Sequence, residues 1–400
     1  MRRTNILLAC LLFAGLLGGL LTYALSRHRH GISANDVHPT GQMPTDQWAL
    51  YDRDPNHLWN RLYRALYQRH TNDGKQYGYD ELDPLLWWQT KYLFSDPANS
   101  RAIAVLDEFL SQNGEGAIAD PLKRAILQRD LWAVFDWLAQ SQNGSAQKSA
   151  LQNKLAEVIR RLALRPEEIT KLPDFYQEAI KANAFPITYD SSKPSRPFLP
   201  ADLFDQNGRW VMLSAGGGQP IARGHVAFAS GRSVFLIFMR LPGGRAATLD
   251  YLKSVASFPK PWVADRNGPG GVMPNPNMPQ FPAGTQLALV RKANVIDSDG
   301  NLRPTNIVED IQIRVHRTIP KQIPDGVNLS DNPADTALDP FEFKLSRPKL
   351  FAGENGGLRA VPAGEEEFAL LASHGIDFEQ RETLRMCATC HFRPGVHSML

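Results

Sequence analysis

The chain has 400 residues, 43% of them hydrophobic, which is enough for one large or two ordinary domains. Its 44 basic and 41 acidic side chains leave a net charge of only +3, which argues against a nucleic-acid-binding protein. Glycine (30 residues) and proline (29 residues) predict long irregular connections but exclude a wholly disordered chain.

Residues 1–27 predict a signal-anchor that spans a membrane, followed by a polar linker over residues 28–50. Ile6–Leu25 is a stretch of 20 residues without a charge, and about 20 apolar residues are needed to cross a bilayer. A cleaved signal peptide with its cleavage site at residues 24–26 is the alternative. Its apolar core would exceed the usual ~7–15 residues, so we favour the uncleaved anchor.

Residues 51–183 are predicted to form a helical domain. Asp-Pro pairs such as Asp54-Pro55 and Asp120-Pro121 place a capping side chain before a proline suited to the first turn of a helix. An Asn143-Gly144 turn is expected to join two antiparallel helices. Apolar residues recur at helical spacing in three sets, namely Leu58, Leu62, Ala65 and Leu66; Leu127, Leu131, Val134, Phe135 and Leu138; and Leu151, Leu155, Val158, Ile159 and Leu162.

A proline-rich connection over residues 184–208 leads to a predicted β-rich domain over residues 209–350, where the apolar period changes to two. The expected elements are a hairpin of residues 225–229 and 233–241, a short helix over residues 248–257, a second hairpin of residues 286–296 and 307–318, and a strand around residues 341–345. The predicted fold class is therefore α+β, with a β-sandwich or partial barrel after the helices.

In the second hairpin, alternation predicts two different faces for neighbouring side chains. Ile311, Ile313 and Val315 are expected to point toward a core. Gln312, Arg314 and His316 alternate with them, so His316 is expected on the solvated face.

The strongest functional motif lies in the C-terminal segment, residues 351–400, where Cys387-Ala388-Thr389-Cys390-His391 has the Cys-x-x-Cys-His pattern of c-type haem attachment. Two intervening residues allow both sulfurs to bond to one macrocycle, and the adjacent imidazole becomes the proximal iron ligand. A zinc site would need about four ligands, and the chain lacks a second Cys/His pair. A thioredoxin-like dithiol would normally follow a strand in a βαβ unit, which is not predicted here.

The position of this motif near the C-terminus resembles that in helical-bundle cytochromes, whose haem is attached to the last helix. The resemblance covers only the motif and its position. It implies a haem-attachment helix, and Glu379–Met386 has helical spacing directly before the motif.

The sixth position of the iron would decide the chemistry, because a Met or His ligand there suits electron transfer and an open position suits ligand binding or peroxide chemistry. Five side chains are candidates for the sixth ligand, namely His374, Met278, Met273, His397 and Met399.

The sequence therefore predicts a monohaem c-type protein that transfers electrons to a partner protein or a small electron carrier. Two alternatives stay open: a haem enzyme with an open sixth position that acts on peroxide or a small oxide, and a non-haem binding or scaffold protein with a redox or metal-binding motif. Because c-type haem is attached outside the bacterial cytoplasmic membrane, we expect the chain on the periplasmic side, in contact with lipid through residues 6–25.

Overall fold

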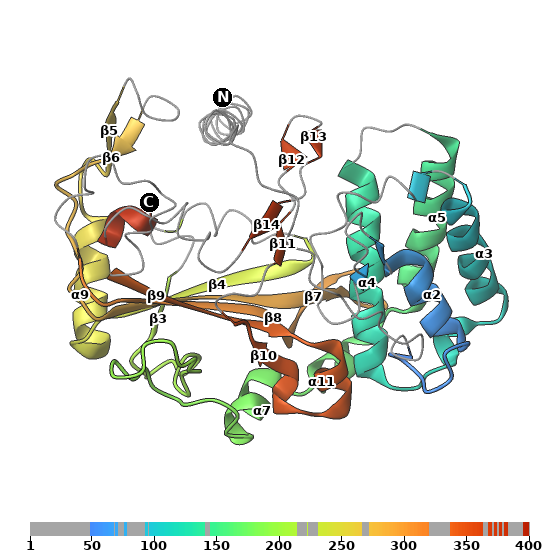
Figure 1. The fold of residues 1–400 in the computed structure, drawn as a ribbon, viewed down its shortest axis with the longest axis horizontal. Coiled ribbons are helices and arrows are strands. Elements are labelled where there is room, and N and C mark those ends of the chain that lie inside the picture. The colour runs from blue at the N-terminus through green and yellow to red at the C-terminus, as the bar shows by residue number, and fades with distance from the viewer. Residues whose placement is uncertain are drawn as a thin grey trace, which may run out of the picture.

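The computed structural model describes residues 49–67, 69–70, 76–77, 93–94, 96–140, 145–213, 222, 231–265, 272–319, 337–362, 367–369, 372–373, 376–377, 380–382 and 395–399. Within these ranges most helices come first in the chain and most strands follow (Figure 1). The mixed α+β class predicted from the sequence is confirmed.

The helical part contains α2 (Leu58–Tyr67), α3 (Ala98–Ser111), α4 (Pro121–Gln140), α5 (Ala146–Arg161), α6 (Pro166–Thr170) and α7 (Phe175–Lys181), together with the 3-10 turn η3 (Gly114–Gly116). The three sets of apolar residues at helical spacing fall in α2, α4 and α5, as predicted, except that Leu162 is the C-cap residue that follows α5. A short strand pair, β1 (Arg69–His70) and β2 (Gln76–Tyr77), follows α2.

The start of α4 follows from its first residues. The Asp120 carboxylate accepts a hydrogen bond from the Leu122 backbone N–H at 2.8 Å, and Pro121 occupies the first helical position, where no N–H donor is needed. Ser145 caps α5 in the same way, by accepting from the Lys148 N–H at 3.2 Å. Local capping chemistry therefore fixes both helix starts.

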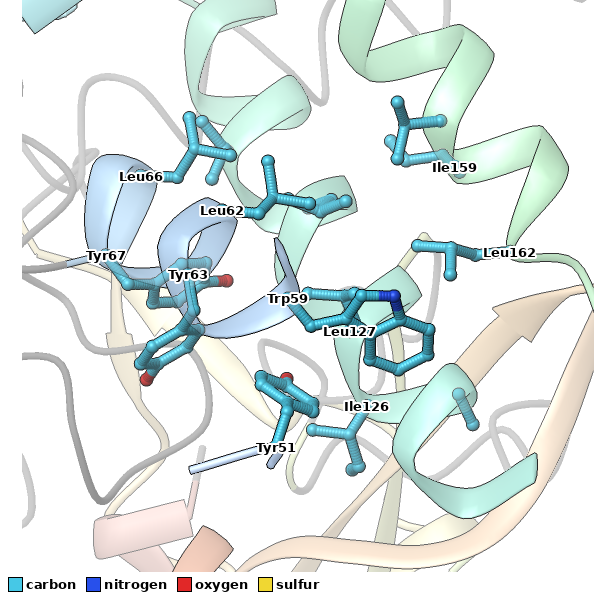
Figure 2. Close-up of a cluster of buried hydrophobic side chains, with 14 of the residues drawn as sticks. Tyr51, Trp59, Leu62, Tyr63, Leu66, Tyr67, Ile126, Leu127, Ile159 and Leu162 are labelled. Atoms are coloured by element: carbon cyan, nitrogen blue, oxygen red, sulfur yellow. The ribbon is translucent and has the colours of Figure 1, made fainter. Parts of the chain in front are cut away.

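The core of the helical part forms where α2 meets α4 and α5 (Figure 2). Trp59 of α2 is fully buried there, and its indole N–H donates to the Gly114 carbonyl at 2.7 Å, so the polar edge of the ring is satisfied. The same cluster continues into the sheet through Ala293, Val295 and Ile307. The helices thus pack directly on one end of the sheet.

The sheet has six antiparallel strands in the order β10-β9-β8-β7-β4-β3. Their bounds are β3 (Val211–Leu213), β4 (Ser233–Arg240), β7 (Thr285–Ile296), β8 (Leu302–His316), β9 (Leu338–Leu345) and β10 (Leu358–Ala360). The other described strands form isolated pairs, β5 (Trp262–Ala264) with β6 (Val272–Pro274), β11 (Glu367–Ala369) with β14 (Gln380–Glu382), and β12 (Ala372–Ser373) with β13 (Ile376–Asp377). Six of the described strands therefore form one open sheet, no second large sheet packs on it among the described residues, and the expected sandwich or barrel is wrong for this part of the chain.

Each face of the sheet has its own cover. Ile311, Ile313 and Val315 pack on one face against α7 and the segment that follows it, so the predicted direction of these side chains is confirmed. On the other face, Ile237 and Met239 of β4 pack against α9 (Gly244–Ala256) and the 3-10 turn η7 (Gly395–Met399), which lie beside each other in Figure 1. The helix α11 (Arg347–Ala352) and the turn η6 (Asn355–Gly357) connect β9 to β10.

The hairpin predicted around residues 297–301 is β7–β8. The Asp297 side chain accepts from the backbone N–H groups of Asp299 and Asn301 at 3.0 and 2.7 Å, and Gly300 has a positive φ of 82°. The other predicted hairpin is seen only in part, because β4 pairs with β3 and β7 and residues 225–229 lie outside the described residues.

Two further expectations need correction. Residues 380–382 form the strand β14, not the start of the predicted helix, and residues 383–394 lie outside the described residues. Residues 6–25 also lie outside them, and none of the helices that the structure describes is long and apolar enough to cross a membrane. The predicted membrane anchor and the periplasmic location inferred with it are not supported, and we withdraw both.

Candidate functional site

Of the residues predicted to form the haem site, the structure describes only some. Cys387, Cys390, His391 and His374 lie outside the described residues. Met273 lies in β6, and Met278 lies in the loop that leads from β6 to β7. His397 and Met399 belong to η7.

The turn η7 docks against the loop before β7. The backbone N–H of Val396 donates to Gln280 Oε1 at 2.7 Å, and the Val396 side chain is fully buried. Gly395 has a positive φ of 56°, and a Cβ atom at this position would lie 2.0 Å from Gln280 Oε1. Glycine is therefore needed at residue 395 both for its backbone conformation and for the close approach of Gln280.

An apolar cluster surrounds the docked turn, and Met278 belongs to it with only 4% of its surface exposed. Met273 and His397 are half-buried. The fold thus brings the loop of Met278 next to the end of the chain, across 116 residues of sequence between Gln280 and Val396. The other buried members of the cluster are Val211, Leu213, Ala222, Ile237, Met239, Leu241, Tyr251, Leu252, Val255, Phe281 and Leu287.

His316, at the end of β8, is the residue that sequence reasoning placed wrongly. The alternation of β8 is as predicted, but His316 is only 4% exposed because the loop before β7 covers this end of the sheet. Its ring packs edge-on against Phe281, with ring centroids 4.8 Å apart. Burial lowers the pKa of His316 to about 3, so the imidazole is neutral near pH 7.

The Nε2 atom of His316 is buried and has no hydrogen-bond partner. A buried polar atom without a partner costs about 1–3 kcal/mol, so such atoms are rare and need a reason. No periodicity in β8 indicated this environment. The one hint in the sequence is Phe281, an aromatic residue in the proline-rich loop that ends just before β7.

A second polar group lies further along β8, where a β-bulge changes the direction of one side chain. Arg291 pairs with Asp310 but Lys292 pairs with Val308, so Glu309 has no partner across the ladder. The bulge aims Glu309 at the same side of the sheet as Arg291, whose Nε lies 3.2 Å from the Glu309 carboxylate. A strand without a bulge would have sent Glu309 and Asp310 to opposite faces.

Glu309 is held by buried partners from three elements. Arg129 of α4 forms an ion pair with it at 2.6 Å, and both side chains are almost completely buried. The Ser233 hydroxyl of β4 donates to Glu309 Oε2 at 2.6 Å. This network connects the helical part to the centre of the sheet, and its tight pairing gives it a structural role.

Asp310 differs from Glu309 because the positive charges that lie near it, those of Arg291 and Lys344, do not offset the cost of its burial. Burial raises the pKa of Asp310, which is 6% exposed, while Gln312 donates to its Oδ2 atom at 3.3 Å. The Oδ1 atom is buried without a partner. This buried carboxyl group could hold and release a proton inside the protein.

The described residues contain no cluster of three or more His, Cys, Asp or Glu side chains that could hold a metal ion. The sequence predicted a metal-binding protein, and the described part of the chain does not support that prediction. A surface pocket of about 360 Å³ lies between α6 and the start of β8. Its charged lining residue, Arg303, is engaged with Asp297 at 2.6 Å, so the pocket offers little chemistry.

Comparison of the chain with models of protein families, with curated proteins and with solved structures found no match.

Proposed function

We propose that the chain is an electron-transfer protein that carries one haem, attached covalently through Cys387 and Cys390, with His391 as the proximal iron ligand. The observation that carries this proposal is the Cys-x-x-Cys-His motif, which contains two of the three cysteines of the chain. When bound, the haem would supply one-electron chemistry. A redox partner protein or a small electron carrier would deliver or receive the electron.

The surroundings of the docked turn η7 support this proposal. Gly395 is four positions after His391, and a chain reaches at most about 3.6 Å per residue, so the Cα atom of His391 can lie no more than about 14 Å from that of Gly395. An apolar cluster that includes Met278 and Phe281 lies at Gly395 and Val396. Haem is a large apolar group, and burial against such a cluster tunes its potential.

One buried polar atom lies beside this apolar cluster. His316 presents a buried nitrogen without a hydrogen-bond partner beside Phe281 of the cluster. A neutral imidazole is the form that binds metals. The cluster therefore offers apolar cover at the segment that follows the motif.

The test is expression of the full chain together with a c-type haem maturation system, followed by a denaturing gel stained for haem peroxidase activity. We expect stain at the 44.6 kDa chain, because a thioether-linked haem survives denaturation. The double variant Cys387→Ala/Cys390→Ala should lose the stain. The matched control is Cys10→Ala, which removes the remaining cysteine and should keep it.

A wild-type chain that stays unstained while a control cytochrome matures in the same cells would overturn the proposal. The motif would then be better explained as a redox dithiol or a metal site. Equal staining of wild type and the double variant would show a haem that is bound elsewhere in the chain.

A second candidate is a haem enzyme with an open sixth position that acts on peroxide or a small oxide. The observation that favours it is Asp310, because a buried carboxyl group with a raised pKa could serve as a general acid or base. Carbon monoxide binding by the reduced protein, together with peroxide turnover that falls in Asp310→Asn, would support the enzyme over the electron carrier.

A further inference from the structure

We infer that the guanidinium groups of Arg209 and Arg240 form a binding site for an oxyanion, the phosphate or carboxylate group of a small molecule. The site lies at the edge of the sheet, where β3 begins and β4 ends. It is independent of the haem proposed above, because it uses β4 and the turn before β3 and involves no residue of the C-terminal segment.

The strand pairing places Arg240 beside Trp210. β3 and β4 are antiparallel with Val211 opposite Met239, and the same register continued by one residue puts Trp210 opposite Arg240. Side chains opposite each other in such a ladder lie on the same face of the sheet. Trp210 packs on that face in a core with Phe238 of β4. Arg240 therefore lies at the rim of this core.

Arg209 brings a second guanidinium group to the same edge. Its Nε and Nη2 atoms donate to Asp202 at 2.8 and 3.3 Å, and its backbone N–H donates to the same carboxylate at 3.1 Å. Arg245 of α9 donates to the carbonyls of Gly208 and Trp210, on either side of Arg209, at 3.2 and 2.8 Å. These bonds position the backbone and the guanidinium group of Arg209 before a ligand arrives.

The charge of Arg240 is poorly compensated. Its Nη1 atom donates to Gln286 Oε1 at 3.5 Å, which is a long hydrogen bond, and no carboxylate in the described part of the chain forms an ion pair with it. Burial lowers the pKa of Arg240, and the positive charge of Arg209 lowers it further, by more than the attraction of Asp202 raises it. A half-buried charge next to a like charge is unfavourable, so this edge of the sheet needs negative charge.

Other arginines on the strands of the sheet show how such a charge is usually balanced. Arg291 lies 3.2 Å from the carboxylate of Glu309, and Arg303 lies 2.6 Å from that of Asp297. Both have a counter-charge within the fold. An oxyanion from solution would supply the one that Arg240 does not find among the described residues.

The neighbour of Arg240 also has an unsatisfied donor. Trp210 is only 1% exposed, and its indole N–H has no hydrogen-bond partner. Buried indole N–H groups usually have one, as that of Trp59 does at the Gly114 carbonyl. Two adjacent side chains on one face of the sheet thus present donors without a good acceptor, and acceptor oxygens are what an oxyanion provides.

The chemistry of the two guanidinium groups selects the class of ligand. A guanidinium group is planar, stays charged near pH 7 and binds carboxylate or phosphate through two parallel hydrogen bonds. The Nη1 group of Arg209 has no hydrogen-bond partner among the described residues, and its side chain is 47% exposed. A ligand can therefore reach the site from solution without opening the core.

The experiment titrates the full chain with inorganic phosphate and, separately, with acetate, at an ionic strength that is held constant with sodium chloride. Calorimetry measures binding, and thermal unfolding measures the rise in Tm. We expect saturable binding of at least one of the two anions and a rise in Tm that chloride does not produce. Tighter binding of phosphate would assign the site to a phosphate group, and tighter binding of acetate would assign it to a carboxylate group.

The variant Arg240→Met keeps most of the aliphatic stem and removes the charge. Loss of a charge-assisted hydrogen bond should weaken anion binding by about tenfold or more. The matched control is Arg303→Met, which removes a guanidinium group of similar exposure, 46%, that is already paired with Asp297. This control should bind the anion as tightly as wild type does.

Urea unfolding without added phosphate or acetate separates a binding role from a structural one. Arg240→Met should then be at least as stable as wild type, because it removes a half-buried charge that is repelled by Arg209. An arginine that only stabilises the fold would instead destabilise the protein when it is replaced. The inference is overturned if neither anion binds saturably, if Arg240→Met binds the anion as wild type does, or if Arg240→Met unfolds at lower urea without anion.

Discussion

Among the contacts that the structure describes, the free energy of unfolding should depend strongly on two buried ion pairs, Arg347–Asp130 and Arg129–Glu309. Arg347, at the start of α11, donates from Nε to Asp130 Oδ2 at 3.0 Å, and a second bond joins its Nη2 to Oδ1. Both side chains have 0% exposure. Tyr51 also donates to the Asp130 carboxylate, at 3.2 Å, and the rings of Tyr63 and Tyr67 lie beside the guanidinium (Figure 2 shows the three tyrosines).

Replacement of Arg347 by Met would leave the Asp130 carboxylate buried without its ion-pair partner, with only the charge of Arg129 acting on it. Removal of one partner of a buried pair costs about 3–5 kcal/mol, because the desolvation of the remaining charge is no longer compensated by an ion pair. We expect a loss of this size in the free energy of unfolding near pH 7. That is a large share of the ~5–15 kcal/mol that stabilises a typical domain.

The assay is urea unfolding of Arg347→Met with Arg61→Met as the matched control. Arg61 makes the same two-bond contact, with Glu108 at 2.7 Å, but the two side chains are 39% and 29% exposed. Exposed pairs contribute about 0.2–1 kcal/mol, so the control should lose no more than that. Equal losses in the two variants would refute the reasoning.

The double variant Arg347→Met/Asp130→Asn separates the buried charge from the lost packing. The amide is neutral and still offers an oxygen to Tyr51, so the double variant should be more stable than Arg347→Met alone. Acid should have a similar effect on Arg347→Met. Burial raises the pKa of Asp130 above its unfolded value, so the deficit should be largest at neutral pH and shrink as the pH falls and the carboxylate takes up a proton. A double variant less stable than the single one would contradict this account.

Two other predictions concern the end of the sheet near η7. Gly395→Ala should lower the free energy of unfolding by more than Gly353→Ala does. Both glycines have a positive φ, but only at residue 395 would a Cβ atom clash with Gln280. Equal losses of stability in thermal unfolding of the two variants would argue against that clash. Without haem, stability should fall by up to about 1.4 kcal/mol per pH unit between pH 6.5 and pH 3 through His316, whose pKa is lowered to about 3 in the fold. The sign follows from the unfolded state, which binds the proton first as the pH falls, so His316→Phe should flatten the stability profile over this range. An unchanged profile would show that His316 is accessible to protons.

Much of the fold followed from local patterns in the sequence. The apolar spacing of α2, α4 and α5 predicted these helices, and Asp120 marked the start of α4, because helical periods and caps involve residues only a few positions apart. The β7–β8 hairpin was predictable for the same reason, since its turn is stabilised by Asp297 itself. The Cys-x-x-Cys-His motif is also local, because its chemistry depends on spacing within five residues.

What only the tertiary structure decided involves partners far apart in sequence. Alternation along β8 correctly separated Ile311 from His316 but could not reveal what covers each face, and the loop that carries Phe281 proved to bury the imidazole. The bulge at Glu309 depends on the register between two strands, and Arg347 finds Asp130 across 217 residues. The sandwich was wrongly predicted for the same reason. The pairing of β4 with β7 and of β8 with β9, which joins these strands into one open sheet, depends on contacts between distant segments. Periodicity assigns a side chain to a face, whereas its burial, charge state and partners are set by the elements that pack on that face.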